Sequence, residues 1–209
     1  MYKIFNQFIF KILLPFIRLY KLIKWNFYLI KNHEIKIIVG AGTTKFKGWF
    51  PTDIHYLDIT KESDFKKYFS KKKIDKILSE HVLEHLTDEE LNLMLNNFYK
   101  YSSDKINIRV AVPDGFHKDD NYINMVKPGG CGVGAGEHIN LFNYKSLSAL
   151  FEQYGFKTKL VEYWDEKGDF HTNDLNNDNG FIERSFKNDP RNHNGKPTYT
   201  SLIIDFKKK

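Results

Sequence analysis

The chain of 209 residues has a single cysteine, Cys131, and no long hydrophobic run. One thiol excludes an intramolecular disulfide and leaves too few thiolates for a cysteine-based zinc site. The uncharged stretches stay far below the roughly 20 residues that span a bilayer. There is also no small-residue cleavage site of the kind that a signal peptide needs. These absences favour a protein of the reducing cytoplasm that keeps its N-terminal segment.

The distribution of charge argues against a nucleic-acid partner. The net charge is +6, and residues 1–31 hold six cations and no acid: Lys3, Lys11, Arg18, Lys21, Lys24 and Lys31. Subtracting these from the 32 basic residues leaves 26, which equals the number of acidic residues. A domain that binds RNA or DNA gathers basic residues around its site. A neutral domain therefore predicts no nucleic-acid partner.

Composition divides the chain into a basic amphipathic helical segment, residues 1–31, and a domain, residues 32–209. Pro15 kinks the helix or begins a second one. On a helical wheel Lys11 and Arg18 lie opposite an apolar face. Such a helix is typical of contact with the inner membrane surface. Packing on the sheet, on a second subunit or over the active site stays open. The apolar face comprises Phe5, Phe8, Ile9, Leu13, Phe16, Ile17, Tyr20, Ile23 and Phe27.

Strand and helix patterns alternate along the domain. Thr87 and Glu90 predict a capping box, and Gly155 a helix end. The alternation predicts an α/β fold: a doubly wound, Rossmann-like, mostly parallel sheet with helices on both faces and a C-terminal antiparallel strand. A long polar loop joins the last two strands. Strands are expected at residues 35–39, 74–78, 106–112, 157–164 and 199–206, and helices at 61–70, 88–101 and 142–154.

A glycine turn, Val39-Gly40-Ala41-Gly42, follows the first predicted strand. Two glycines let the backbone turn sharply and approach a ligand, and the N-terminus of a following helix would offer free N–H groups. The third glycine of the dinucleotide fingerprint is missing from residues 43–46. A nicotinamide-dependent oxidoreductase is therefore disfavoured, whereas an ordinary tight turn stays open.

Two aspartates come after this turn: Asp53, where a second strand should end, and Asp58. Ligands of open α/β sheets bind at the carboxyl ends of strands, where a carboxylate can accept both hydroxyls of a ribose. Asp53 suits that role. A turn or capping role is the alternative for either residue.

A third motif, Ser79-Glu80-His81-Val82-Leu83-Glu84-His85-Leu86, directly follows the strand at residues 74–78. Its imidazoles and carboxylates suit ligand contact or proton transfer. Glu84 lies between His81 and His85, but the order is not His-Glu-x-x-His and no third ligand is apparent. The sequence thus predicts no metal site, and local packing is favoured for Glu84 and His85.

These motifs in this order, followed by Arg109-Val110-Ala111-Val112-Pro113-Asp114-Gly115, resemble class I S-adenosylmethionine-dependent methyltransferases. More narrowly, they resemble the predicted small methyltransferases of bacterial surface-polysaccharide gene clusters. The resemblance runs from about residue 35 to the C-terminus, although Ile38 replaces an acidic or amide residue common before the turn. It implies cofactor contacts from Gly40, Ala41 and Gly42 to the methionine part, Asp53 to the ribose, Asp58 and Ile59 to the adenine, and Glu80 and His81 near the sulfonium.

The resemblance further implies methyl transfer to a hydroxyl of a nucleotide-linked or lipid-linked sugar in surface polysaccharide biosynthesis. A neutral imidazole suits removal of the hydroxyl proton. His138, which follows the glycine-rich residues 127–136, is the first candidate base, ahead of His81 and His117, and Asp114 is a further catalytic candidate. A non-catalytic cofactor-binding module and a methyltransferase of another small molecule are the alternatives. The oligomeric state stays open.

Overall fold

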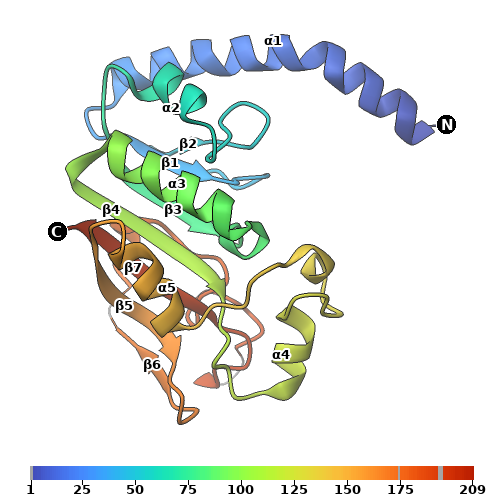
Figure 1. The fold of residues 1–209 in the computed structure, drawn as a ribbon, viewed down its shortest axis with the longest axis vertical. Coiled ribbons are helices and arrows are strands. Elements are labelled where there is room, and N and C mark those ends of the chain that lie inside the picture. The colour runs from blue at the N-terminus through green and yellow to red at the C-terminus, as the bar shows by residue number, and fades with distance from the viewer. Residues whose placement is uncertain (1, 174, 193–194) are drawn as a thin grey trace.

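Seven strands form one mixed sheet in the computed structural model, which describes residues 2–173, 175–192 and 195–209, with side chains from residue 10 onward (Figure 1). The order across the sheet is β2-β1-β3-β4-β7-β5-β6. The first four strands are parallel, and β7 is antiparallel to both β4 and β5. The strands are β1 Lys36–Val39, β2 Phe50–Pro51, β3 Ile74–Glu80, β4 Ser102–Pro113, β5 Phe156–Trp164, β6 Phe170–Thr172 and β7 Ser201–Lys208.

The helices largely begin and end where the local sequence signals predict. Thr87 and Glu90 form the expected capping box, with the Thr87 N–H donating to Glu90 Oε2 at 2.9 Å. Gly155 has a φ of +84° just after the last helix. The helices are α1 Tyr2–Lys31, α2 Glu62–Phe69, α3 Asp88–Tyr101, α4 Asp120–Val126 and α5 Tyr144–Glu152, with short 3-10 turns η1 Leu83–His85, η2 Ala135–Glu137 and η3 Asn177–Asn179.

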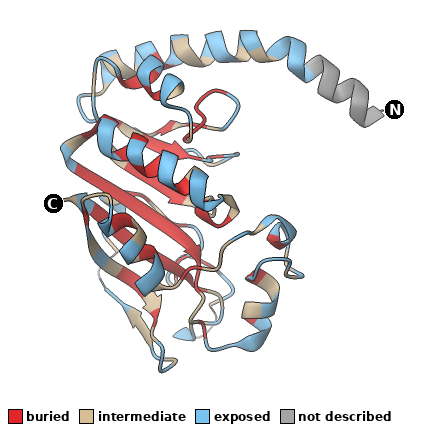
Figure 2. Ribbon diagram, viewed as in Figure 1, coloured by how far each residue is buried: buried red, intermediate tan, exposed pale blue. Residues whose placement is uncertain are grey.

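The predicted α/β class with a Rossmann-like sheet is confirmed, but its two faces are covered differently. One face carries a large cluster in which Trp25 of α1, Phe65 of α2, Leu95 of α3 and Phe151 of α5 pack against the strands. The other face carries a smaller cluster closed by irregular segments, with Phe46, Trp49, Leu175 and Ile182 over Leu78 and Ile203. The helices expected on both faces therefore gather on one. Figure 2 shows the buried strands between these layers.

The N-terminal segment is one helix, α1, which continues through Pro15 and bends towards its N-terminal end (Figure 1). Its last turns are anchored by Trp25, which is 1% exposed and donates from Nε1 to the Tyr68 carbonyl at 2.8 Å. Arg18 Nε also donates to the His55 carbonyl at 2.8 Å. The C-terminal half of α1 thus packs on the domain. The division at residue 31 marks a change in composition and charge, but the two parts are in contact.

Most of the apolar face predicted for this helix points away from the domain, whereas Ile17 in it is half-buried. Exposed side chains run along it at helical spacing, and the predicted members Phe5, Phe8 and Ile9 lie outside the described side chains. The exposed set comprises Leu13 (47% exposed), Phe16 (68%), Tyr20 (54%), Ile23 (47%) and Phe27 (61%), continued by Ile12, Leu19 and Ile30.

A buried ion pair attaches the loop that covers the second face of the sheet, the face without helices. Arg109 on β4 is 0% exposed and forms two hydrogen bonds to Asp205 on β7, Nε to Oδ1 at 2.7 Å and Nη2 to Oδ2 at 2.8 Å. Its Nη1 donates to the carbonyls of Asn176 and Gly180, both at 2.8 Å. The pair therefore holds the loop that closes this side of the molecule.

Candidate active site

Two cavities open at the edge where the parallel strands β1, β3 and β4 end. The smaller, of about 120 Å³, lies between the glycine turn and the segment after β3, with Gly40, Ile54, Leu57, Asp58, Ile59 and Val82 in its wall. The larger, of about 500 Å³, lies beyond β3 and β4. It is lined by residues 131–135 and by His81, Glu84, His85, His138, Arg184, Arg191 and Tyr199.

The glycine turn comes into close contact with the segment that follows β3. Gly40 has a φ of +59°, and a Cβ added there would lie 2.4 Å from Val82 Cγ2. The Ala41 N–H donates to the Thr52 carbonyl at 2.8 Å, which fixes the turn against the end of β2. Gly42 also has a positive φ, +51°, but faces open space. A side chain is therefore excluded at Gly40 by both conformation and contact.

The helix expected after this turn is absent from the described structure. Residues 40–49 form turns and irregular backbone that lead directly into β2. The parallel strands β1 and β2 are thus joined by ten residues, fewer than a helical crossover needs. No helix N-terminus contributes N–H groups at this point, so any ligand of the turn meets its backbone directly.

Both aspartates predicted for the cofactor lie at this edge. Asp58 and Ile59 line the smaller cavity. Burial acts to raise the pKa of Asp58, yet hydrogen bonds from Lys61 and Thr60 hold it below its usual range. Asp53 stands outside the cavity wall, 31% exposed, and accepts the His55 N–H at 3.3 Å. The carboxylate of Asp58 is thus occupied by its neighbours Thr60 and Lys61, whereas part of the Asp53 carboxylate remains exposed.

Glu80 has a different environment from the one expected. Its carboxylate accepts the backbone N–H groups of Glu183, at 3.2 Å, and Arg184, at 2.8 Å. Burial raises its pKa, although these hydrogen bonds and nearby cations oppose the rise. The side chain lines neither cavity. Glu80 therefore anchors the loop that carries Arg184 rather than facing the glycine turn.

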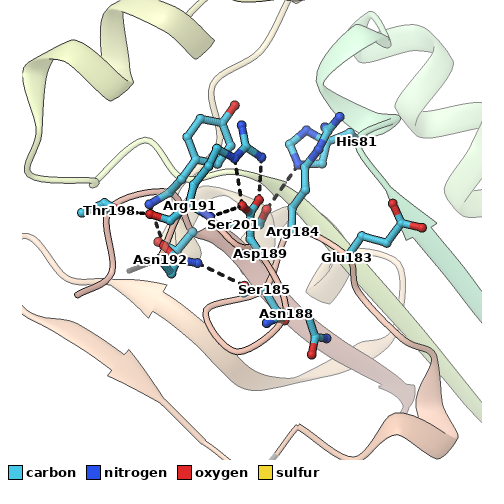
Figure 3. A network of polar contacts seen from close by, with 12 residues as sticks. His81, Glu183, Arg184, Ser185, Asn188, Asp189, Arg191, Asn192, Thr198 and Ser201 are labelled. Atoms are coloured by element: carbon cyan, nitrogen blue, oxygen red, sulfur yellow. Dashed lines mark hydrogen bonds and ion pairs between the residues drawn. The ribbon is translucent and has the colours of Figure 1, made fainter. Parts of the chain in front are cut away.

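His81 occupies the wall of the larger cavity in a strained conformation. Its φ is +54°, the only positive value at a non-glycine residue among the described backbone. Its Nε2 lies 3.2 Å from Ser201 Oγ (Figure 3). Its Nδ1 lies 2.9 Å from Glu84 Oε1. Left-handed backbone at such a residue persists only where the surroundings impose it, and it often marks functional sites.

His138 meets the motif after β3 although 53 residues separate it from His85. The His85 and His138 rings lie 4.8 Å apart at an interplanar angle of 76°. Glu84, fully buried, lies with them, and one potential ligand atom from each residue falls within 4.8 Å of the others. The interpretation that Glu84 and His85 pack only against near neighbours in the sequence is therefore incomplete, because both residues also lie beside the distant His138.

Asp114 and His117 lie outside both cavity walls. Asp114 is 0% exposed, and its carboxylate accepts the N–H groups of Phe116 and Trp164. Burial raises its pKa to about 6. His117 stacks on Tyr122 with ring centroids 3.9 Å apart, and burial lowers its pKa to about 4. Neither side chain reaches the larger cavity, so the catalytic assignment of Asp114 and the candidacy of His117 are not retained.

The long polar loop before β7 supplies the cationic side of the larger cavity. Arg191 lies over the Tyr199 ring, 3.3 Å from its centroid, and donates from Nε to Asp189 Oδ1 at 2.8 Å (Figure 3). Arg184 approaches from the segment that Glu80 holds. The sequence marks this loop only by its polar side chains, so the contribution of Tyr199 had no local signal.

The glycine-rich run forms the opposite wall. A Cβ added at Gly132 would lie 2.6 Å from the Met125 carbonyl, so the loop packs directly on α4. The neighbouring Cys131 is exposed and also lines the cavity. Close backbone approach thus explains part of the glycine content of this run.

A family model described as a methyltransferase domain matches residues 34–161. No curated protein sequence matches the chain. Similar solved structures include a SAM dependent methyltransferase from Archaeoglobus fulgidus, 16% identical, with a TM-score of 0.48, covering 92% of this chain and 94% of that chain.

Two further similar structures were solved with the cofactor or its product. Magnesium protoporphyrin IX methyltransferase from Synechocystis PCC 6803 with bound SAH is 8% identical, with a TM-score of 0.42 and coverage of 92% and 83%. The LepI complex with SAM is 9% identical, with a TM-score of 0.44, and this chain spans only 40% of its length. The family model spans more than half of the chain, and the protein therefore belongs to the methyltransferase domain family.

Proposed function

We propose that this protein transfers a methyl group from S-adenosylmethionine to a hydroxyl group of a sugar-like acceptor. The observation that carries this proposal is the larger cavity, in which three imidazoles and two guanidinium groups surround one space. His81 in its wall is followed directly by Val82, which contacts Gly40 of the glycine turn. The acceptor and cofactor sides of the site are thus one residue apart.

The residues at the glycine turn fit the cofactor. Because Gly40 leaves no room for a Cβ, the turn presents bare backbone to a ligand. Ile54, Leu57 and Ile59 give the smaller cavity apolar surface suited to an adenine ring, and Asp53 has a carboxylate available to ribose hydroxyls. The cofactor supplies an electrophilic methyl group on a sulfonium, while the protein aligns the acceptor and excludes water.

His81 is the proposed proton acceptor, with His138 second, which reverses the order favoured by the sequence. In the tautomer of His81 that carries its proton on Nδ1, the nitrogen 2.9 Å from Glu84 Oε1, Nε2 has a lone pair near Ser201 Oγ and can accept a hydroxyl proton. His138 lines the same cavity and lies beside Glu84 and His85.

The cationic loop supports an acceptor that carries phosphate, such as a nucleotide-linked or lipid-linked sugar of surface polysaccharide biosynthesis. Arg184 and Arg191 line the cavity, and guanidinium groups bind phosphate through two parallel hydrogen bonds. The Tyr199 ring beneath Arg191 offers a flat surface. Histidine, tyrosine and arginine side chains together suit a polyhydroxylated anion.

Asp53→Ala should weaken binding of S-adenosylmethionine at least tenfold. A charged hydrogen bond to the ribose is worth about 1.5 to 3 kcal/mol. Isothermal titration calorimetry measures the affinity, with NAD as the comparison ligand that we expect not to bind. Asp104→Ala is the control, because Asp104 is exposed at the opposite end of β4. An unchanged affinity in a folded Asp53→Ala protein, or NAD binding as tight as that of S-adenosylmethionine, contradicts the cofactor assignment.

We also propose that the exposed face of α1 lies on an anionic membrane surface. No helix in the described part of the chain is long and apolar enough to cross a membrane. Arg18 and Lys21 donate hydrogen bonds to His55 and Tyr56 of the domain, and Arg18 is also exposed, as are Lys11, Lys24 and Lys31. Each exposed cation near anionic lipid contributes about 1 kcal/mol in addition to apolar burial. Contact in the membrane plane would bring the enzyme to a lipid-linked acceptor.

Cosedimentation with vesicles of phosphatidylglycerol and phosphatidylcholine tests this orientation. The protein should pellet at low salt, less at high salt, and remain in the supernatant as the double variant Phe16→Asp/Ile23→Asp. Leu93→Asp is the matched control, because Leu93 is an exposed apolar residue on α3. If the wild type stays in the supernatant, or the same double variant instead dissociates a dimer, the face binds a second subunit or serves another packing role.

A further inference from the structure

Glu84 is a fully buried acid whose charge lacks a hydrogen-bonding partner. It is 0% exposed, and neither carboxylate oxygen accepts a hydrogen bond within the described residues. His81 Nδ1 lies 2.9 Å from Oε1, close enough for an ion pair but not aligned as a hydrogen bond. Burial of an uncompensated carboxylate is strongly unfavourable. A cation bound beside Glu84 would compensate this buried charge.

Two imidazoles beside Glu84 each place one ring nitrogen next to a backbone carbonyl. His85 Nδ1 lies 3.1 Å from the Glu137 carbonyl, and His138 Nδ1 lies 2.6 Å from the Val126 carbonyl. A carbonyl only accepts, so each Nδ1 carries the proton and each Nε2 keeps a lone pair. An outer hydrogen bond of this kind is the usual support of a metal-binding histidine.

The backbone holds these three residues together. The N–H groups of Ile139 and Asn140 both donate to the Glu84 carbonyl, at 2.7 and 3.0 Å. The Asn140 side chain also donates to the Leu86 carbonyl at 2.6 Å. The loop that carries His138 is therefore docked on η1, and the cluster exists before any ligand binds.

We propose that Glu84, His85 and His138, which line the larger cavity, bind a divalent transition-metal ion there. A ligand atom from each residue lies within 4.8 Å of the others, so the three donors lie close to one another. Two imidazoles and one carboxylate favour Zn²⁺, Mn²⁺ or Fe²⁺ over Mg²⁺ or Ca²⁺. The sequence predicted no metal because the third ligand, His138, is distant along the chain.

Three protein ligands leave coordination positions open towards the cavity. A hydroxyl bound at such a position loses its proton more readily, and the ion orients its oxygen. This role in activating the acceptor rests on the proposed methyl transfer to a hydroxyl. Binding of the ion depends only on the three side chains, and is measured without cofactor or acceptor.

Titration of the untagged, chelator-treated protein with CoCl₂ and ZnCl₂ tests the site. We expect one bound ion per chain, visible d–d absorption for Co²⁺, and a raised Tm with Zn²⁺. Glu84→Gln and His138→Asn should each weaken binding roughly 100-fold or more, beyond the loss that outer-shell changes cause. His171→Asn is the control, because His171 pairs with Asp165 at 2.8 Å away from both cavities.

Glu84→Gln also provides a readout that is independent of affinity. The isosteric amide removes the buried charge, so the metal-free variant should unfold at the same or a higher temperature than the metal-free wild type. Only the wild type should then gain stability from Zn²⁺. If the folded wild type binds no ion, if His138→Asn retains full affinity, or if His171→Asn loses as much, the metal site is refuted. Because the assay contains no S-adenosylmethionine, such a result leaves the proposed methyl transfer standing.

Discussion

Replacement of His81 by asparagine should lower turnover by roughly 10² to 10⁴, the usual contribution of a positioned general base. Asparagine tolerates the φ of +54° recorded at this position but has no basic nitrogen. Affinity for S-adenosylmethionine should stay nearly unchanged, since His81 lines the larger cavity and not the smaller one. Methyl transfer from labelled S-adenosylmethionine to a panel of nucleotide-linked sugars measures the loss.

Two further variants separate a chemical role of His81 from a structural one. His81→Gly relieves the left-handed backbone, worth about 1 to 2 kcal/mol, and should raise stability without restoring turnover. His171→Asn should transfer methyl groups normally, because His171 lies outside both cavity walls. If His81→Asn and His138→Asn both turn over an accepted sugar at the wild-type rate, the reaction needs no histidine base and the assignment is wrong.

Truncation of Arg109 to alanine should lower the free energy of unfolding by about 3 to 5 kcal/mol. The change leaves Asp205, which is 2% exposed, as an uncompensated buried charge. It also removes the donor shared by the Asn176 and Gly180 carbonyls, so the loop over the second face loses its attachment. Urea unfolding followed by circular dichroism gives the difference.

The double variant Arg109→Met/Asp205→Leu should recover much of this loss, because replacing both partners of a buried pair by apolar groups is often nearly neutral. Lys145→Met is the exposed counterpart: Lys145 pairs with Glu166 at 2.5 Å, with side chains 56% and 46% exposed. That variant should change the free energy of unfolding by less than about 1 kcal/mol. A loss below that value for Arg109→Ala contradicts the anchoring role.

Local signals predicted most of the fold. The capping box at Thr87 set the start of α3 at the correct residue, and the β-branched runs located β1, β3, β4, β5 and β7. The strand β6 has only three residues, too few for an alternating pattern. The seven-residue α4 begins with the side-chain cap of Asp119 and has little apolar spacing to reveal it. Short elements were missed because tertiary contacts, not periodicity, define them.

The site was harder to predict, because its contacts join distant parts of the chain. Glu80 ends β3 and Asp114 directly follows β4, where ligand-binding acids often lie, yet N–H groups of residues 183, 184 and 164 donate to their carboxylates. His138 joins Glu84 and His85 only because the next two residues hydrogen-bond to the Glu84 carbonyl. No spacing along the sequence predicts such a contact, so His138 could not be assigned to the same cluster as Glu84 and His85.

The lone thiol gives this protein a built-in attachment point. Cys131 is exposed and lines the larger cavity, and the chain has no other cysteine to compete for a thiol-directed reagent. A fluorophore or spin label attached to the natural sequence would therefore report from the wall of the cavity without engineered mutations. Small thiol-reactive fragments would likewise be captured only at this wall, and each captured fragment would map the space beside it.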